Sequence, residues 1–210
     1  MFNQRIYIAV SITLLVTACL YLKCLIFLFM LFNLAITYDV WYMVHISNVN
    51  KIISLIFYLS MCAFNTYLLL IYNMEPFFLL QIAFVTQVSD IYQYIAGQHW
   101  GKNKIGWISK NKSYEGYIVG YLFTIITFVP ILISLDYYLF FGHLDLFSSV
   151  LIKKFVKCTV IYILGIIGGL LSSFFKRMTN IKDYSDLLGA HGGWTDRIDS
   201  IILPMLLISF

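Results

Sequence analysis

Charged residues are scarce in this chain of 210 residues, and that scarcity argues against an ordinary soluble domain. Asp, Glu, Lys and Arg together make up 11% of the sequence, and there are only three prolines. A soluble domain carries about 25% charged and about 45–50% apolar residues. Here 61% of the residues are hydrophobic and 18% are aromatic. The composition therefore predicts a membrane protein of one domain, whose aromatic rings anchor it at two lipid–water interfaces.

Cysteine is also sparse, and its placement argues against a disulfide framework or a zinc site. Cys19, Cys24, Cys62 and Cys158 each lie in an apolar stretch, without a C-x-x-C partner or a histidine at ligand spacing. We interpret them as small hydrophobic residues. The first apolar run lacks a clear small-residue cleavage site, so we expect a retained span rather than a cleaved signal peptide.

Long apolar runs dominate what is present. A transmembrane helix needs ~20 mostly apolar residues. Six candidates are residues 6–22, 25–45, 52–72, 76–95, 117–141 and 156–175. The apolar tail 198–210 would reach ~20 Å as a helix, which is too short for a ~30 Å hydrocarbon core. The predicted fold class is all-α: a polytopic integral membrane helical bundle with about six spans and a short C-terminal apolar helix.

Positive charge gathers in two polar segments, 97–116 and 176–199. The first contains Lys102, Lys104, Lys110 and Lys112, and the second contains Lys176, Arg177, Lys182 and Arg197. Because two predicted spans separate the segments, both should emerge on the same side of the membrane. The positive-inside rule makes that side cytoplasmic.

The second segment combines groups that suit the binding of phosphate. Asp196 and Asp199 are three residues apart, and therefore on one face if helical. Clustered carboxylates repel unless a cation lies between them, and their hard oxygens suit Mg²⁺. The Lys and Arg side chains can neutralise phosphate oxygens. Gly192 and Gly193 would let backbone N–H groups approach an anion. These parts suit transfer chemistry at phosphorus, where positioning and charge stabilisation dominate.

A structural interpretation of the same residues stays open at this point. Thr195 could cap the last helix, with Asp196 complementing the helix N-terminus. Lys176 and Arg177 could be an ordinary stop signal after a span.

An acidic residue, Asp90, precedes the first segment, and burying its charge in a membrane would cost free energy. Asp90 lies near the end of an apolar span, where an ionisable group is a functional candidate, although it could face the headgroups instead. Lys112 and Glu115 are three residues apart and could pair across one helical turn. Asp39 and Asp136 lie near span ends beside tyrosines, and we assign both to the lipid–water interface.

The second segment resembles the signature of CDP-diacylglycerol synthases (phosphatidate cytidylyltransferases), which is S-x-x-K-R-x4-K-D followed by P-G-H-G-G-x-x-D-R-x-D. The positions that match at the right spacing are Ser173, Lys176, Arg177, Lys182, Asp183, His191, Gly192, Gly193, Asp196, Arg197 and Asp199. The first segment resembles the family's other motif, an Asp-bearing helix followed by S-P-x-K-T-W-E-G. Its matching positions are Asp90, Ser109, Lys112, Glu115 and Gly116. The resemblance covers roughly residues 85–204.

Both motifs also depart from the family pattern. Lys110, Ser113 and Tyr114 stand where Pro, Thr and Trp are usual, and Gly189 and Ala190 replace a Pro-Gly pair. These departures bear on substrate choice and turnover more than on fold.

The resemblance implies an enzyme that transfers CMP from CTP to phosphatidate, giving CDP-diacylglycerol and pyrophosphate in phospholipid biosynthesis. It implies Mg²⁺ as the cofactor, bound at Asp196 with Asp183 and Asp199 as further ligands. The implied catalytic and phosphate-holding residues are Asp90, Lys112, Glu115, Lys176, Arg177, Lys182, His191 and Arg197. Ser109, Ser173, Gly192 and Gly193 would bind substrate.

The expected organisation combines the apolar runs with this resemblance. Residues 1–75 would form N-terminal spans. Residues 76–210 would form a catalytic membrane region whose two motif segments meet in space, all within one structural domain. The expected partners are CTP, phosphatidate and the lipid bilayer, with no nucleic acid, and a homodimer is left open.

Three alternatives remain at this level. The same chemistry could act on another lipid phosphate, such as an ether-linked archaeal-type one. A related CTP-dependent polyprenol or phytol kinase would instead transfer phosphate to an alcohol and release CDP. A diverged paralogue could be a non-catalytic membrane scaffold.

Overall fold

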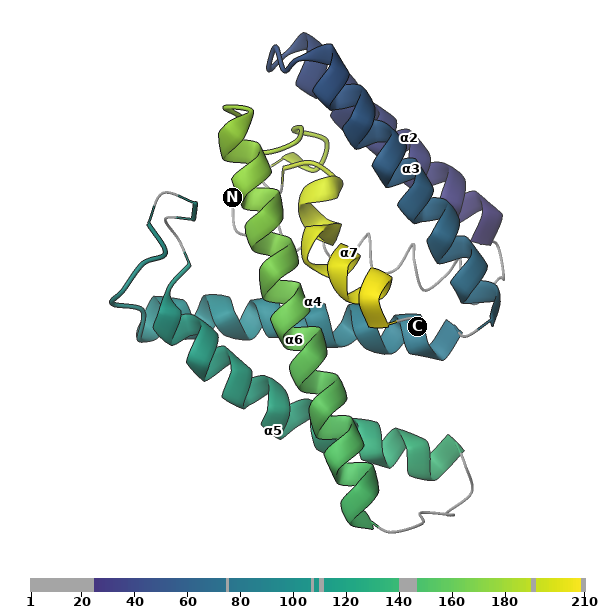
Figure 1. Cartoon of the computed structure of the whole chain (residues 1–210), viewed down its shortest axis with the longest axis vertical. Helices are drawn as coiled ribbons and strands as arrows, with labels where there is room; N and C mark the ends of the chain where they lie inside the picture. The colour runs from purple at the N-terminus through teal and green to yellow at the C-terminus, as the bar shows by residue number, and fades with distance from the viewer. Residues whose placement is uncertain are drawn as a thin grey trace. The chain divides into compact units, whose positions relative to one another are not determined.

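The structure is a computed structural model that describes residues 25–74, 76–106, 108–109, 112–139, 147–189 and 192–208 (Figure 1). The described helices are α2 (Leu25–His45), α3 (Lys51–Met74), α4 (Pro76–His99), α5 (Tyr114–Leu139), α6 (Phe147–Met178) and α7 (Thr195–Ile208). Within these residues there is no β-strand, only an isolated bridge between Lys104 and Ser113. The predicted all-α class is confirmed for this part of the chain.

The predicted apolar spans correspond to helices wherever the structure describes them. Spans 25–45, 52–72, 76–95, 117–141 and 156–175 overlap α2 to α6 in order, and the predicted span 6–22 lies outside the described residues. Among the described helices, two stretches are long and apolar enough to cross a membrane, Tyr114–Ser134 of α5 and Val150–Met178 of α6. The C-terminal helix α7 begins at Thr195, three residues earlier than expected.

The chain divides into two compact units. Unit 1 comprises Met1–Glu75 and Phe175–Asp199, and unit 2 comprises Pro76–Phe174 and Ser200–Phe210. The second motif segment therefore belongs to the same unit as α2 and α3, whereas the first motif segment belongs to the unit that contains α4 and α5.

Unit 1 is built on α2 and α3, which lie side by side (Figure 1). Asn50 caps α3, because its side-chain oxygen accepts the N–H of Ile52 at 2.8 Å. The core of this unit is a buried apolar cluster of Met43, Val49, Phe57, Ile181 and Tyr184. The ring of Phe57 stacks on Tyr184 at a centroid distance of 4.9 Å, so the segment after α6 packs against the helix pair.

The end of α6 directs the chain into that cluster. Asn180 has a left-handed backbone with φ of 57°. The N–H of Ile181 returns to the carbonyl of Lys176 at 2.9 Å, and the N–H of Asn180 bonds the carbonyl of Arg177 at 3.2 Å. This bonding pattern is a Schellman ending, which commonly brings the following residue into an apolar contact. Here that residue is the buried Ile181, and the motif residues come immediately after it.

In unit 2, α4 and α5 approach each other through glycines. A Cβ on Gly116 would lie 2.9 Å from the Cα of Gly97, and a Cβ on Gly120 would lie 2.9 Å from the Cγ and 3.0 Å from the Cα of Gln93. Small residues that allow such close backbone approach are typical of helix pairs in membranes.

Helix α6 packs across both of these helices. The hydroxyl of Tyr162 donates to the backbone carbonyl of Tyr117 at 2.6 Å. A Cβ on Gly165 would lie 3.2 Å from the Cγ2 methyl of Thr86. Unit 2 is thus held by α4–α5, α5–α6 and α4–α6 contacts.

We expect Gly120→Ala to destabilise the protein although alanine favours a helix interior by ~1 kcal/mol. The new methyl group would meet the backbone of Gln93, which cannot move without separating α4 from α5. Overpacking of this kind costs roughly 1–3 kcal/mol. The matched control is Gly165→Ala, whose methyl group would lie 3.2 Å from the side-chain methyl of Thr86 and at an ordinary contact distance of 3.6 Å from the carbonyl oxygen of Ser200, and which should be close to neutral. Thermal unfolding of the purified variants measures both; equal melting temperatures would contradict the glycine contact.

Candidate functional site

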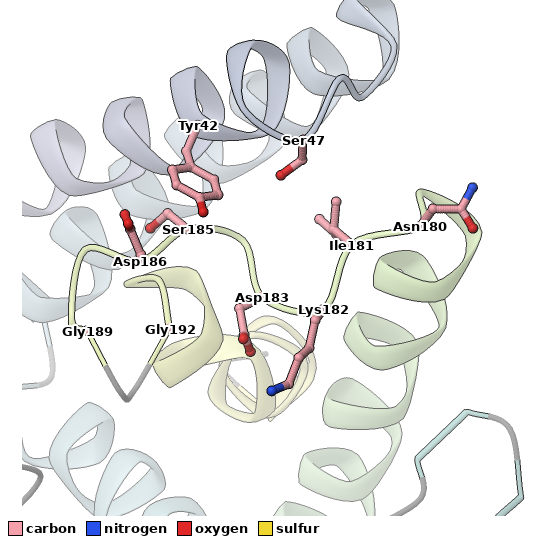
Figure 2. Close-up of a pocket in the computed structure, with 10 residues that line it drawn as sticks. All are labelled: Tyr42, Ser47, Asn180, Ile181, Lys182, Asp183, Ser185, Asp186, Gly189 and Gly192. Atoms are coloured by element: carbon pink, nitrogen blue, oxygen red, sulfur yellow. The ribbon is translucent and has the colours of Figure 1, made fainter. Parts of the chain in front are cut away.

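A cavity of about 350 Å³ lies in unit 1 beside the second motif segment. Its walls are Tyr42, Ser47, Asn180, Ile181, Lys182, Asp183, Ser185, Asp186, Gly189 and Gly192. Figure 2 shows Tyr42 and Ser47 approaching from α2 and the turn after it, with the loop that follows α6 opposite them. The volume is within the usual range for small-molecule sites. Three of the predicted site residues, Lys182, Asp183 and Gly192, line this one cavity.

Asp196 holds together two parts of the motif loop, which we define as residues 179–195, from the end of α6 to the first residue of α7. Its Oδ2 accepts the backbone N–H groups of Tyr184 and Gly193, both at 2.9 Å. Its Oδ1 accepts the Nζ of Lys176 at 2.6 Å. The Asp196 side chain is only 3% exposed. Among the described residues, these three donors engage both lone pairs of Oδ2 and one of Oδ1.

Lys176 provides the charge that makes this burial tolerable. Besides its contact with Asp196, its Nζ lies 3.9 Å from Oδ2 of Asp199. It also lies 5.1 Å from the centroid of the Tyr184 ring, at cation–π distance. The motif lysine at the end of α6 therefore faces both carboxylates at the start of α7.

Gly192 lies between two of the predicted metal ligands. Its φ is 75°, a backbone conformation that favours glycine. A Cβ at this position would lie 2.9 Å from Oδ2 of Asp196 and 3.3 Å from Cγ of Asp183. The carboxyl groups of Asp183 and Asp196 therefore flank the same glycine, and Asp183 is the more exposed of the two residues.

Asp39 corrects the sequence analysis, which assigned it to the lipid–water interface. The residue is fully buried, with 0% exposure. Its Oδ2 accepts both the backbone N–H and the hydroxyl of Thr195, each at 2.8 Å. Its Oδ1 accepts the hydroxyl of Ser185. A charge in an apolar helix is costly unless it is hydrogen-bonded, and the donors come from the motif loop.

The same bonds decide how α7 begins. The hydroxyl of Thr195, which the structural interpretation made a helix cap, donates its hydrogen to Asp39. The same carboxylate accepts the N–H of Thr195, the first residue of α7. A negative group there also complements the helix dipole.

Unit 2 contains the residues of the first motif. The hydroxyl of Ser113 accepts the N–H of Gly116 at 3.1 Å and so caps α5, a task that the family's usual threonine can also perform. Glu115 accepts the side-chain amide of Asn103 at 2.6 Å and its backbone N–H at 3.1 Å. The Nζ of Lys112 lies 5.9 Å from the ring centroid of Tyr117. The Glu115 carboxylate thus binds the preceding loop, rather than serving only as a partner for Lys112.

Two more predicted residues of unit 2 form defined bonds. Oδ2 of Asp90 accepts the hydroxyl of Ser200 at 2.7 Å, which joins α4 to α7. The hydroxyl of Ser173 donates to the carbonyl of Gly169 within α6 at 2.8 Å. Ser109 is partly buried in the loop before α5.

The remaining predictions have a mixed outcome. Arg177 and Arg197 are exposed, and Lys182 is exposed at the cavity. His191 lies outside the described residues, as do Lys110 and Ala190, and the side chain of Asp136 is not among those described. Among the described residues, no three His, Cys, Asp or Glu side chains form a ready metal cluster. The assignment of Asp183, Asp196 and Asp199 to Mg²⁺ stays a prediction.

The sequence analysis did not single out Ser185 or the cavity-wall residues Tyr42 and Ser47, and it placed Asp39 at the lipid–water interface. One signal was available, because Asp39 is an isolated acid within a long apolar run, the same property that singled out Asp90. Nothing in the local pattern indicated Tyr42 or Ser47.

Comparison with known proteins identifies relatives of the chain. It is 32% identical to the phosphatidate cytidylyltransferase of Aquifex aeolicus (strain VF5) over 149 residues, which are 70% of this chain and 51% of that protein. It is 32% identical to the phosphatidate cytidylyltransferase of Rickettsia bellii (strain RML369-C) over 164 residues, which are 75% of this chain and 63% of that protein. The corresponding enzyme of Haemophilus influenzae is 32% identical over 64% of this chain and 45% of its own length. The matched region thus spans about half to three fifths of these relatives.

A family model extends the match to the whole chain. The model described as the cytidylyltransferase family covers residues 1–210. The residues that hold the cavity loop in unit 1 and those that cap and tether α5 in unit 2 all lie within that match. The chain therefore belongs to the cytidylyltransferase family.

Proposed function

We propose that this protein is a phosphatidate cytidylyltransferase, which converts CTP and phosphatidate into CDP-diacylglycerol and pyrophosphate. Family membership over the full chain and the names of its relatives support the reaction class. The structural observation that carries the proposal is the convergence of Lys182, Asp183 and Gly192 on one cavity, beside the bonded pair of Lys176 and Asp196.

The cavity suits a nucleotide triphosphate better than an apolar ligand. Its lining includes Lys182, whose exposed side chain ends in an ammonium group, and the hydroxyl-bearing residues Tyr42 and Ser47. Such groups bind phosphate oxygens by charge-assisted hydrogen bonds. Tyr42 offers an aromatic face on the opposite wall, against which a pyrimidine base can lie (Figure 2). The nucleotide would therefore bind between α2 and the motif loop of unit 1.

The donor set of the motif also fits Mg²⁺. This ion usually binds proteins through one or two carboxylates and completes its shell with water and substrate phosphates, so a cluster of three acids is not required. Asp183 lines the cavity, and Oδ1 of Asp196 accepts one donor, Lys176, among the described residues. We assign the ion to these two residues, with Asp199 nearby on α7. When bound, the ion would neutralise phosphate charge on the nucleotide.

The chemical step is a displacement at phosphorus. A phosphate oxygen of phosphatidate attacks the α-phosphorus of CTP, a new P–O bond forms, and the bond to the β-phosphate breaks with release of pyrophosphate. The chain contributes by holding two anions together, with Lys182 and Arg177 as exposed cations near the motif. The prediction that the two motif segments meet at one site stays a prediction from the sequence.

The proposed setting is a multi-pass membrane protein with six spans and cytoplasmic motif segments. The two apolar stretches of α5 and α6 support it. Large apolar side chains are also exposed along the helices, including Leu34, Ile52, Ile118 and Ile126. Exposed apolar surface of this extent is expected where lipid chains cover a protein. A homodimer stays an open prediction.

The first expected result concerns the reaction itself. Purified protein in mixed micelles with phosphatidate, Mg²⁺ and CTP labelled at the α-phosphorus should transfer label into the lipid phase, and EDTA should abolish the transfer. Label that enters lipid only from γ-labelled CTP would identify a kinase and contradict the proposal. Transfer to another lipid phosphate, but not to phosphatidate, would correct the substrate alone.

Asp183 gives the sharper test of the metal assignment, because Asp196 also holds the loop. We expect Asp183→Asn to lower kcat/KM by about 100-fold and to raise the Mg²⁺ concentration needed for half-maximal rate. Thermal unfolding of the variant should match that of the unaltered protein. An unchanged Mg²⁺ dependence would remove Asp183 from the metal site.

A matched pair of lysines tests the nucleotide cavity. Lys182→Gln removes a charge from the cavity wall, whereas Lys51→Gln removes the same charge from an exposed position at the start of α3. A lost charge-assisted hydrogen bond of 1.5–3 kcal/mol corresponds to roughly a 10–100-fold rise in KM for CTP. We expect that rise only for Lys182→Gln, and equal KM values for the two variants would place the triphosphate elsewhere.

A further inference from the structure

The buried carboxylate of Asp39 joins α2 to two points of the motif loop. One oxygen accepts the hydroxyl of Ser185, in the middle of the loop, and the other accepts the N–H and hydroxyl of Thr195, at its end. These bonds connect residues 146 and 156 positions apart in the sequence. A single side chain of α2 therefore fixes two points of the loop that closes the cavity.

Gly193 of the motif loop lies in close contact with the carboxylate of Asp39. A Cβ on Gly193 would lie 2.8 Å from Oδ1 of Asp39 and 2.9 Å from the backbone nitrogen of Ser185. The backbone of the loop thus lies directly on Asp39, without a side chain between them. A change in the shape or charge of Asp39 would be transmitted to the loop backbone.

The loop in turn sets the position of Asp196. The N–H of Gly193 donates to Oδ2 of Asp196, and Thr195 directly precedes Asp196 in the chain. Asp39 holds Gly193 by contact and Thr195 by two hydrogen bonds. Displacing these residues would move the carboxylate of Asp196 relative to Asp183, since both flank Gly192.

We propose that Asp39 is a positioning residue for nucleotide binding: it does not touch CTP, but holds the loop of Ser185, Gly193 and Thr195 in the geometry that receives it. This inference rests on the proposed function. If stability alone were required, apolar packing would serve this buried position in α2 at lower cost than a charge. The donors that the charge recruits all belong to the motif loop.

The test measures CTP binding and kinetics on the full chain in detergent micelles. Asp39→Ala leaves the hydroxyls and the N–H of its partners unsatisfied. We expect it to raise both the calorimetric Kd and the KM for CTP on the order of tenfold or more, with an unchanged KM for phosphatidate. Asp39→Asn can still accept from Thr195 and donate to Ser185, so it should give an intermediate value. Thr195→Val, which removes one donor to the same carboxylate, should change the CTP constants in the same direction.

Ile36→Ala is the matched control for a merely structural effect. Ile36 is fully buried on the same helix, one turn before Asp39. Its truncation should lower thermal stability and leave the Kd for CTP unchanged.

If the Asp39 variants lose stability like Ile36→Ala but bind CTP with the unaltered Kd, Asp39 is not a positioning residue. If the unaltered protein itself fails to bind CTP, the proposed function is wrong, and this inference falls with it. Should Asp39→Ala not fold, the Asn and Thr195→Val variants decide the question.

Discussion

Two buried carboxylates, Asp39 and Asp196, hold the loop between α6 and α7, and the geometry of unit 1 depends on them. A charge removed from water must be met by donors, and an apolar chain offers few of these apart from backbone N–H groups. Asp196 takes the N–H groups of Tyr184 and Gly193, and Asp39 takes the N–H of Thr195. Each carboxylate thus holds a different part of the loop in place through these hydrogen bonds. The backbone N–H groups that offset the cost of burying these carboxylates are therefore also the contacts that fix the shape of the loop.

The carboxylates of the second motif consequently differ in their tasks. Asp196 is largely engaged by Lys176 and by the loop backbone, whereas Asp183 lines the cavity and is more open. A motif that reads as a set of equivalent acids in the sequence therefore contains one acid suited mainly to holding the loop and another suited to a ligand. In unit 2, Glu115 likewise holds a loop, the one that precedes α5.

Packing outside the motifs brings these groups to their places. The Schellman ending of α6 turns Ile181 into the apolar cluster with Phe57 and Tyr184, so that Lys182 and Asp183 lie between two anchored residues. In unit 2, glycine contacts between α4 and α5 give the first motif a rigid support. These contacts are short and backbone-mediated, and they restrict the residues that each position accepts.

The sequence by itself determined the helices and the family. Each long apolar run must satisfy its backbone hydrogen bonds internally, so residues 25–45 form one helix with the predicted bounds. The spacing from Ser173 to Asp199 identified the family, because those residues match its signature at the right positions. Only the tertiary structure decided the burial and the hydrogen-bond partners of Asp39. Its partners lie 146 and 156 residues away, and the local pattern around it is the same for an acid that faces headgroups and for one that is buried. The cavity wall from Tyr42 and Ser47 was equally undetermined, because the contact of α2 with the motif loop arises from folding and leaves no periodic signal in either segment.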